Sequence, residues 1–176
     1  PGDNVEKERK MGIKVTVNHF PESVHGADLV IFSAAIPPDN PERMEAERLG
    51  IPAIERSVAM GWISCLYKAP ICISGTHGKT TATALVTQIL ELSGKDPGAI
   101  IGGKLPLING YGKSGKGDNI VIEACEFSNT YHHLVPETAV LLNIDQDHLD
   151  FFKTMDNLKA SFKKFCNLST NKVIAN

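Results

Sequence analysis

The sequence has little net charge and no long apolar run. The formal net charge of its 176 residues is −2, so bulk electrostatics give no reason to expect a nucleic-acid partner or binding to an anionic membrane. No apolar stretch approaches the length of a membrane-spanning helix, and residues 1–10 are polar, unlike a secretory signal. We therefore expect neither a nucleic-acid partner nor a membrane segment.

Cysteine is also scarce, and the four cysteines are scattered without the spacing of a metal site. Cys72 lies inside an apolar run that predicts a buried strand. We therefore expect reduced thiols and a cytoplasmic protein. There is no internal repeat and no low-complexity segment. The remaining composition, 42% hydrophobic and 22% charged, is that of a globular chain with a true core. The length allows one domain or parts of two.

The most informative stretch, residues 71–92, has the order strand, glycine loop, Lys-Thr, helix. The run from Ile71 to Ile73 predicts a buried parallel strand, and Leu85, Ile89 and Leu92 recur at helical spacing. Free N–H groups at a helix start, together with the helix dipole, favour a phosphate. A lysine there adds positive charge, and a threonine hydroxyl can ligate Mg²⁺. The stretch predicts a nucleotide site.

The loop departs from the strict G-x-x-x-x-G-K-[ST] pattern, because its first glycine would fall at Ile73. The chain has a tighter loop instead, from Gly75 through Gly78 to Lys79 and Thr80. The alternative interpretation is an ordinary strand-to-helix turn with an exposed lysine. The flanking strand, the two glycines and the periodic helix favour nucleotide binding.

The remaining pattern predicts an α/β fold with parallel sheets in two sections. The first has a β-β-α-β-α order. Its strands are expected at residues 12–17, 29–32 and 51–54, and its helices at residues 41–49 and 57–66. The second adds strands at residues 99–103, 119–123, 138–143 and 171–176. It also has a helix at residues 155–165 and a loop or hairpin at residues 105–116. We predict part of a Rossmann-like domain over residues 1–67. It is followed over residues 68–176 by the front of a P-loop-type ATP-binding domain.

Ligands of doubly wound sheets bind beyond the carboxyl ends of the strands. In the first section this rule points to Ser33, Asn40 and Arg56. Each of them is also explained by a turn, a helix cap or a surface charge. The pattern alone leaves both interpretations open.

In the second section, Glu123 and His148 each follow an apolar strand in the same region as the phosphate loop. With the hydroxyl of Thr80 they would supply oxygen and nitrogen ligands to Mg²⁺. The alternative is a solvated glutamate, a histidine that binds nothing and a turn of acidic residues over 145–150. Glu126 and Asp147 are candidates for residues that support the metal ligands or contact a substrate. His77 is either a substrate contact or a loop filler.

Four stretches of the chain resemble the Mur ligase family. They are Gly75-Thr-His-Gly-Lys-Thr-Thr81, Ser33-Ala-Ala-Ile-Pro-Pro-Asp-Asn-Pro-Glu42, Glu123-Ala-Cys-Glu126 and Asn143-Ile-Asp-Gln-Asp-His-Leu-Asp150. The resemblance implies an enzyme of three domains: a UDP-sugar domain, a central ATP domain and a Rossmann-like third domain. By this comparison the chain holds the later part of the first domain and the front of the second, without the third.

The resemblance also implies roles for individual residues. The ATP loop would comprise Gly75, Thr76, His77, Gly78, Lys79, Thr80 and Thr81. The catalytic lysine would be Lys79, with Glu123 and His148 as catalytic residues that bind Mg²⁺ together with Thr80. Substrate contacts would come from His19, Ser33, Asn40, Arg56, His77 and Glu126.

The chain departs from the family pattern at three places. Asn18-His19 replaces the usual Gly-His, and Cys125 replaces an aspartate of the usual Glu-Ala-Asp-Glu motif. The substitution removes a carboxylate and puts a ligand or base role at this position in doubt. Phe162 stands where sister ligases carry a modified lysine, so no carbamate is expected.

The implied reaction is ATP-dependent amide formation between L-alanine and UDP-N-acetylmuramate, through an acyl phosphate, in peptidoglycan precursor synthesis. The alternatives are a ligase that recycles a muramyl tripeptide, and a nucleotide-binding module that switches conformation without ligation. We expect the chain alone not to ligate. We also expect its apolar strand at residues 171–176 to pair at its edge and favour a homo-oligomer.

Overall fold

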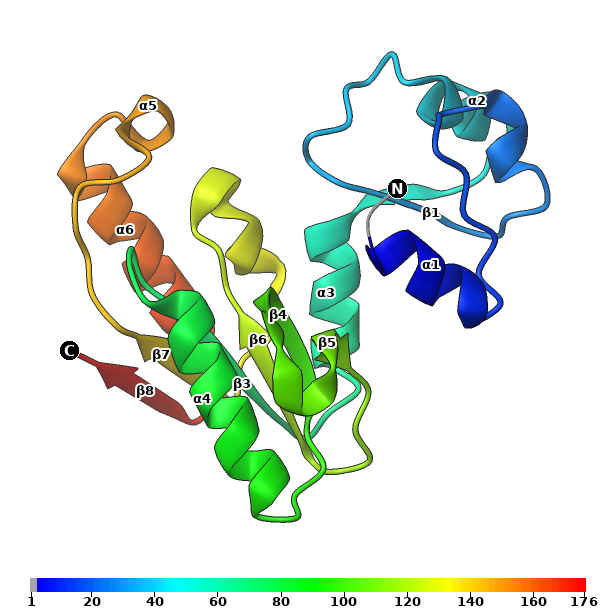
Figure 1. The fold of residues 1–176 in the computed structure, drawn as a ribbon. Helices are drawn as coiled ribbons and strands as arrows, with labels where there is room; N and C mark the ends of the chain where they lie inside the picture. Colours follow the sequence, from blue (N-terminus) through cyan, green and yellow to red (C-terminus); the bar gives the residue numbers. More distant parts are fainter. Residues whose placement is uncertain (1–2) are drawn as a thin grey trace. The chain divides into compact units, whose positions relative to one another are not determined.

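The computed structural model describes residues 3–176, which divide between Arg56 and Ser57 into two compact units. The first unit has a short parallel pair of strands, β1 and β2 (Figure 1). Its elements are α1 (Asp3–Lys10), η1 (Pro21–Val24), β1 (Val30–Phe32), α2 (Pro41–Leu49) and β2 (Ala53–Glu55).

Helix α2 begins and ends where its sequence predicts. The side chain of Asn40 accepts hydrogen bonds from Glu42 N at 3.0 Å and Arg43 N at 3.3 Å, which caps the first turn. Pro41 occupies the first helical position, and Gly50 ends the helix with φ 69°. The cap gives Asn40 a structural role, which agrees with the interpretation of this residue as a helix cap.

The strand predicted over residues 12–17 is wrong. This segment has no regular structure and follows helix α1, which the sequence did not predict. Ile13 and Val17 are 50% and 71% exposed, and no strand within residues 3–176 pairs with the segment. Alternating β-branched residues form a strand only where a neighbouring strand takes up their backbone hydrogen bonds.

The second unit is built on a six-stranded sheet with the order β5-β4-β6-β3-β7-β8, in which only β5 is antiparallel to its neighbour. The α/β class with a mostly parallel sheet is confirmed. The elements are α3 (Arg56–Ser64), β3 (Ala69–Ser74), α4 (Lys79–Leu92), β4 (Gly98–Leu105), η2 (Pro106–Ile108), β5 (Gly110–Lys113), β6 (Asn119–Glu123), η3 (Phe127–His133), β7 (Thr138–Leu141), α5 (Leu149–Phe152), α6 (Met155–Cys166) and β8 (Lys172–Ala175). Within residues 3–176, no helix has both the length and the apolar character needed to cross a bilayer.

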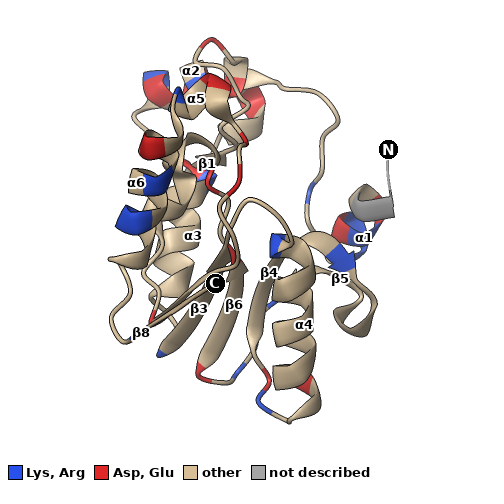
Figure 2. Ribbon diagram, turned by 90° about the vertical axis from the view of Figure 1, so that its left-hand side faces the viewer, with Lys and Arg blue, Asp and Glu red and all other residues tan. Residues whose placement is uncertain are grey.

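Helices cover both faces of this sheet. Figure 2 shows α4 on one side of the strands and α3 and α6 on the other. Alternate residues along each strand serve the two faces: Ile120 and Ile122 join the core with Phe162 of α6, whereas Ala99 packs with Ala84 of α4. The sheet is therefore the middle layer of three.

Helix α4 forms as predicted, but its apolar stripe does not face the sheet. Leu85, Ile89 and Leu92 are 54%, 63% and 76% exposed, whereas Thr83 and Thr87 are fully buried. The Thr87 hydroxyl donates to Thr83 O at 2.7 Å, so its polar atom is satisfied inside the helix. Small threonines let the helix lie close to the sheet.

The sheet register brings three loops to one edge. Ile73 of β3 is level with Glu123 of β6 on one side and with Val140 of β7 on the other. Because these strands are parallel, the segments that follow them all leave from the carboxyl edge. Along the chain, β4 lies to one side of β3 and β7 to the other, so the strand order reverses here. This is the position where sheets of this kind bind ligands.

Candidate functional site

The loop between β3 and α4 depends on two glycines. Gly75 has φ 140° and Gly78 has φ 82°, backbone conformations that L side chains rarely adopt. A Cβ atom at Gly75 would lie 3.1 Å from both the N and the O atoms of Asn143. The loop therefore lies directly against the segment that follows β7.

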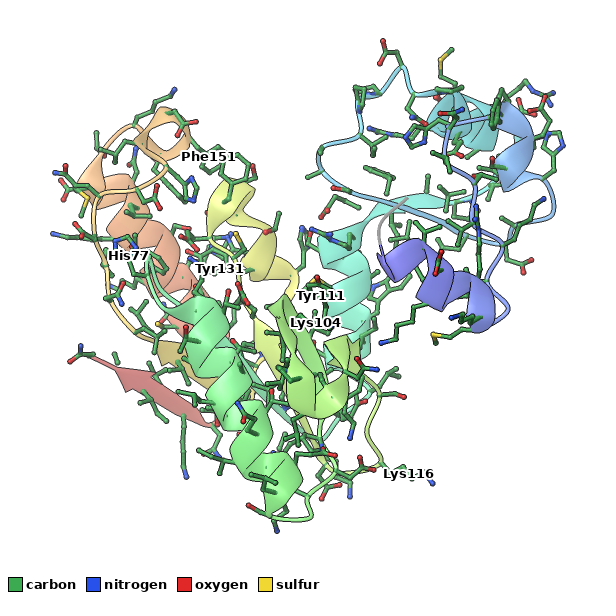
Figure 3. The ribbon with its side chains drawn as sticks, viewed as in Figure 1. His77, Lys104, Tyr111, Lys116, Tyr131 and Phe151 are labelled. Carbon is green, nitrogen blue, oxygen red and sulfur yellow. The ribbon has the colours of Figure 1, made fainter. Side chains whose placement is uncertain are left out.

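A set of hydrogen bonds clamps the loop to that segment. His77 N donates to Asn143 Oδ1 at 2.8 Å, and Asn143 Nδ2 donates back to His77 O at 3.0 Å. The Thr76 hydroxyl accepts from Asp145 N at 2.9 Å. The backbone of His77 thus has a structural role, while its ring, 3.5 Å from an Asp145 oxygen, is exposed (Figure 3). Sequence reasoning missed Asn143, because it appeared there as the last residue of a predicted strand.

Lys79 points back toward the sheet. Its ammonium group donates to Gly75 O at 2.7 Å, Thr76 O at 3.0 Å and Glu126 Oε1 at 3.0 Å. The side chain of Lys79 is 15% exposed and that of Glu126 is 1% exposed. A charge-assisted hydrogen bond in such a buried setting is stronger than one at the surface.

Thr80 and Glu123 meet as the sequence predicts. The Thr80 hydroxyl donates to Glu123 Oε1 at 2.8 Å, and the other carboxylate oxygen accepts from Gly102 N at 2.7 Å. The glycine pair Gly102-Gly103 within β4 leaves room for both side chains. A Cβ at Gly102 would lie 2.7 Å from Glu123 Oε1, and one at Gly103 would lie 2.8 Å from Thr80 Cγ2. Thr81, the next residue of the helix, is exposed.

The structure groups His148 with Glu126 and Asp147. His148 Nε2 lies 3.9 Å from Glu126 Oε1 and 3.8 Å from Asp147 Oδ2. Its backbone is left-handed, with φ 50°, and its N–H donates to Asp147 Oδ1 at 2.8 Å. The Phe127 ring lies 5.1 Å from the imidazole, between centroids. Within residues 3–176 no ion pair joins His148 to Glu123, so a site shared by Thr80, Glu123 and His148 stays a prediction.

These residues fit a divalent cation. One atom from each of Glu126, Asp147 and His148 lies within 4.8 Å of the others. Glu126 Oε2 is buried and has no hydrogen-bond partner in the described part of the chain, which leaves a carboxylate oxygen free to accept. Carboxylate oxygens are the ligands that Mg²⁺ prefers. The hydrogen-bonded pair of Thr80 and Glu123 offers further oxygens at the same edge of the sheet.

Cys125, between the two glutamates of the motif, does not replace the missing carboxylate. Loss of water around its sulfur raises the pKa of the Cys125 thiol, although the residue reaches the surface. Without a metal the thiol is therefore protonated at neutral pH and does not supply the negative charge of the missing carboxylate. Phe162 is fully buried, with its ring edge-on to Tyr131, so an apolar ring occupies that helix position.

The predicted substrate residues of the first unit have local partners or face solvent. His19 Nδ1 lies 2.8 Å from Glu42 Oε2, and the Ser33 hydroxyl accepts from Ala35 N at 3.3 Å. Arg56, the first residue of α3, is exposed. Their substrate roles remain predictions.

Comparison with known proteins identifies the family. The profile described as the Mur ligase middle domain matches residues 73–176, and the one described as the Mur ligase family, catalytic domain, matches residues 2–68. The UDP-N-acetylmuramate–L-alanine ligase of Caldanaerobacter subterraneus subsp. tengcongensis is 44% identical over 164 residues, which are 93% of this chain and 36% of that protein. The same ligase of Alkaliphilus metalliredigens is 41% identical over 90% of the chain and 35% of its own length.

A solved structure of a Mur ligase also matches the fold of this chain. The crystal structure of the UDP-N-acetylmuramate–alanine ligase from Thermotoga maritima matches with a TM-score of 0.88 and 27% identity, over 98% of this chain and 40% of that one. The chain thus spans about a third of the length of the curated relatives it matches. The resemblance seen in the sequence is confirmed. The chain belongs to the Mur ligase family.

Proposed function

We propose that the chain is the nucleotide-binding part of an enzyme that joins L-alanine to UDP-N-acetylmuramate at the expense of ATP. The observation that carries the proposal is the site at the carboxyl edge of the sheet. A clamped glycine loop presents Lys79 and Thr80 there, beside the carboxylates of Glu123 and Glu126. Relatives that bear this ligase name match 90–93% of the chain at 40–44% identity, which supports the same function.

Each group has a place in such a reaction. The loop N–H groups and Lys79 would bind the phosphates of ATP and stabilise the charge of the transferring phosphoryl group. Mg²⁺, held by Thr80, Glu123 and His148 or by the group around Glu126, would neutralise phosphate charge when bound. The muramyl carboxylate would take the γ-phosphoryl group to give an acyl phosphate. The amine of L-alanine would then displace phosphate.

The two sections of the chain would divide the substrates. Residues 1–67 would belong to the UDP-sugar domain, with His19, Ser33, Asn40 and Arg56 near that substrate. Residues 68–176 would belong to the ATP domain. We place the reaction in the cytoplasm, where ATP and reduced thiols coexist.

A substrate-dependent phosphate-release assay on the full-length protein tests the proposal. Phosphate release should require both UDP-N-acetylmuramate and L-alanine. Release with a muramyl-pathway tripeptide but not with L-alanine would instead identify a recycling ligase. ATP binding or hydrolysis without any dependence on an amine acceptor would identify a nucleotide switch.

A further inference from the structure

The ammonium group of Lys79 has no donor left for a phosphate. A lysine has three N–H donors, and here they meet Gly75 O, Thr76 O and Glu126 Oε1 at 2.7–3.0 Å. A nucleotide phosphate that contacts Lys79 must therefore displace at least one of these partners. Two of these partners are backbone carbonyls of the loop that carries Lys79, so they remain close to the lysine if the loop moves.

Glu126 is the partner that has an alternative binding partner available. Its carboxylate is 1% exposed, and its oxygen Oε2 has no hydrogen-bond partner within the described residues. The oxygen that accepts from Lys79, Oε1, also lies 3.9 Å from His148 Nε2, and Asp147 completes the group. The same carboxylate thus pairs with the lysine of the phosphate loop and belongs to the group that fits a cation.

We propose that Glu126 exchanges partners when nucleotide binds. In the free protein it holds Lys79 away from the phosphate position, and phosphate arrival releases the carboxylate to a divalent cation beside His148 and Asp147. This inference rests on the proposed nucleotide function of the loop. It adds a coupling that the function does not require: nucleotide and cation each favour binding of the other through one side chain.

The exchange has a consequence for nucleotide binding without metal. A nucleotide that binds alone must separate Lys79 from a buried carboxylate and leave that carboxylate without a counter-charge, which is unfavourable. When the cation is present, it takes over the carboxylate, and this cost disappears. Glu126 therefore weakens metal-free binding and strengthens the response to metal.

The test measures ADP binding to the full-length protein by isothermal titration calorimetry, in EDTA and in excess Mg²⁺. Glu126→Gln removes the charge at nearly constant volume and should tighten metal-free ADP binding about tenfold, the worth of one charged hydrogen bond. Its gain in affinity from Mg²⁺ should be smaller than that of the wild type. Thermal unfolding checks that the variant folds.

Two further variants separate partner exchange from simple charge repulsion. Glu126→Asp keeps the negative charge but shortens the side chain by one methylene, so it should also tighten metal-free binding. Asp147→Asn removes a nearby charge that does not contact Lys79, so it should change metal-free binding much less. In a Lys79→Met background, Glu126→Gln should have no effect on metal-free binding, because the partner is gone.

The outcomes are distinct. Wild-type protein that binds no ADP even with Mg²⁺ would overturn the proposed nucleotide site itself. Normal ADP binding, with equal affinities for wild type, Glu126→Gln and Glu126→Asp in EDTA, would overturn the partner exchange alone. An Asp147→Asn effect as large as that of Glu126→Gln would replace it with general electrostatics.

Discussion

The amide N–H of Gly102 donates a hydrogen bond of 2.7 Å to Glu123 Oε2, in the space where a side chain at residue 102 would lie. The glycine thus fixes the carboxylate that also accepts from Thr80. A residue on β4 therefore determines the position of a candidate metal ligand on β6.

Gly102→Ala should displace Glu123 more than it disturbs the fold. The added Cβ would lie 2.7–2.9 Å from the two carboxylate oxygens, and the end of a side chain moves more easily than backbone. We expect a higher Mg²⁺ requirement for ligase activity, with a loss of unfolding free energy of about 1 kcal/mol. Enzyme assays across Mg²⁺ concentrations and urea unfolding measure the two effects. In a Glu123→Ala background the glycine substitution should cost little further activity; an undiminished loss there would contradict this account.

Glu123→Ala and His148→Ala should each raise the Mg²⁺ concentration needed for activity, if both residues serve one ion. Their combined effect should then be smaller than the sum of the separate effects in free energy, because the second change acts on a site already impaired. A Mg²⁺ titration of wild type, single and double variants measures this. Additive losses with normal Mg²⁺ dependence would mean that the two residues have structural roles.

Much of the fold follows from local pattern. Strand β6 and helix α2 begin and end at the predicted residues, because each combines a clear apolar pattern with turn or cap residues. Helix α4 was predicted from Leu85, Ile89 and Leu92, yet its sheet-facing positions are Thr83 and Thr87. Periodicity predicts a helix but does not say which stripe is buried, since that depends on how closely the sheet approaches.

The site was partly predictable. The loop motif placed Lys79 and Thr80 at one edge, and the end of an apolar strand placed Glu123 there; sheet register explains why Thr80 and Glu123 meet. The ion pair of Lys79 with Glu126 and the clamp through Asn143 were not predictable, because both depend on the paths of loops after the strands. Spacing in the sequence carries no information about those paths.

Lys79→Ala should abolish ATP use, since it removes a charge-assisted contact to phosphate worth about 2–4 kcal/mol in the transition state. In the structure the ammonium group lies against the buried Glu126 carboxylate. We therefore expect the variant to lose about 3 kcal/mol of unfolding free energy as well. Lys79→Ala combined with Glu126→Gln should regain stability and remain inactive. Turnover by either variant at the wild-type rate would refute the role of Lys79.

The last prediction concerns His132, which lies on η3 outside the candidate site. Its ring stacks on Tyr131 with centroids 4.6 Å apart, and its Nε2 lies 3.0 Å from Ser161 O, so Nε2 carries the proton that the carbonyl accepts. Burial, with smaller contributions from Lys164 and His133, lowers the pKa of His132 below its ordinary value of 6.5. The folded protein therefore favours the neutral imidazole.

The sign of the pH dependence follows from this shift. Between the lowered pKa and 6.5 the unfolded chain binds more protons at His132 than the folded chain does, so stability falls as pH falls. His132→Gln, which retains an N–H for the Ser161 carbonyl, should lose this contribution. The wild type should thus lose stability relative to His132→Gln as the pH is lowered from about 7.5 to 5 in urea unfolding, the range over which histidine gains its proton. His133→Gln, at the exposed neighbouring histidine, should depart from the wild type less than His132→Gln does, because His133 contributes less than burial to the lowered pKa of His132. A constant difference between wild type and His132→Gln across this range would show that His132 titrates alike in both states.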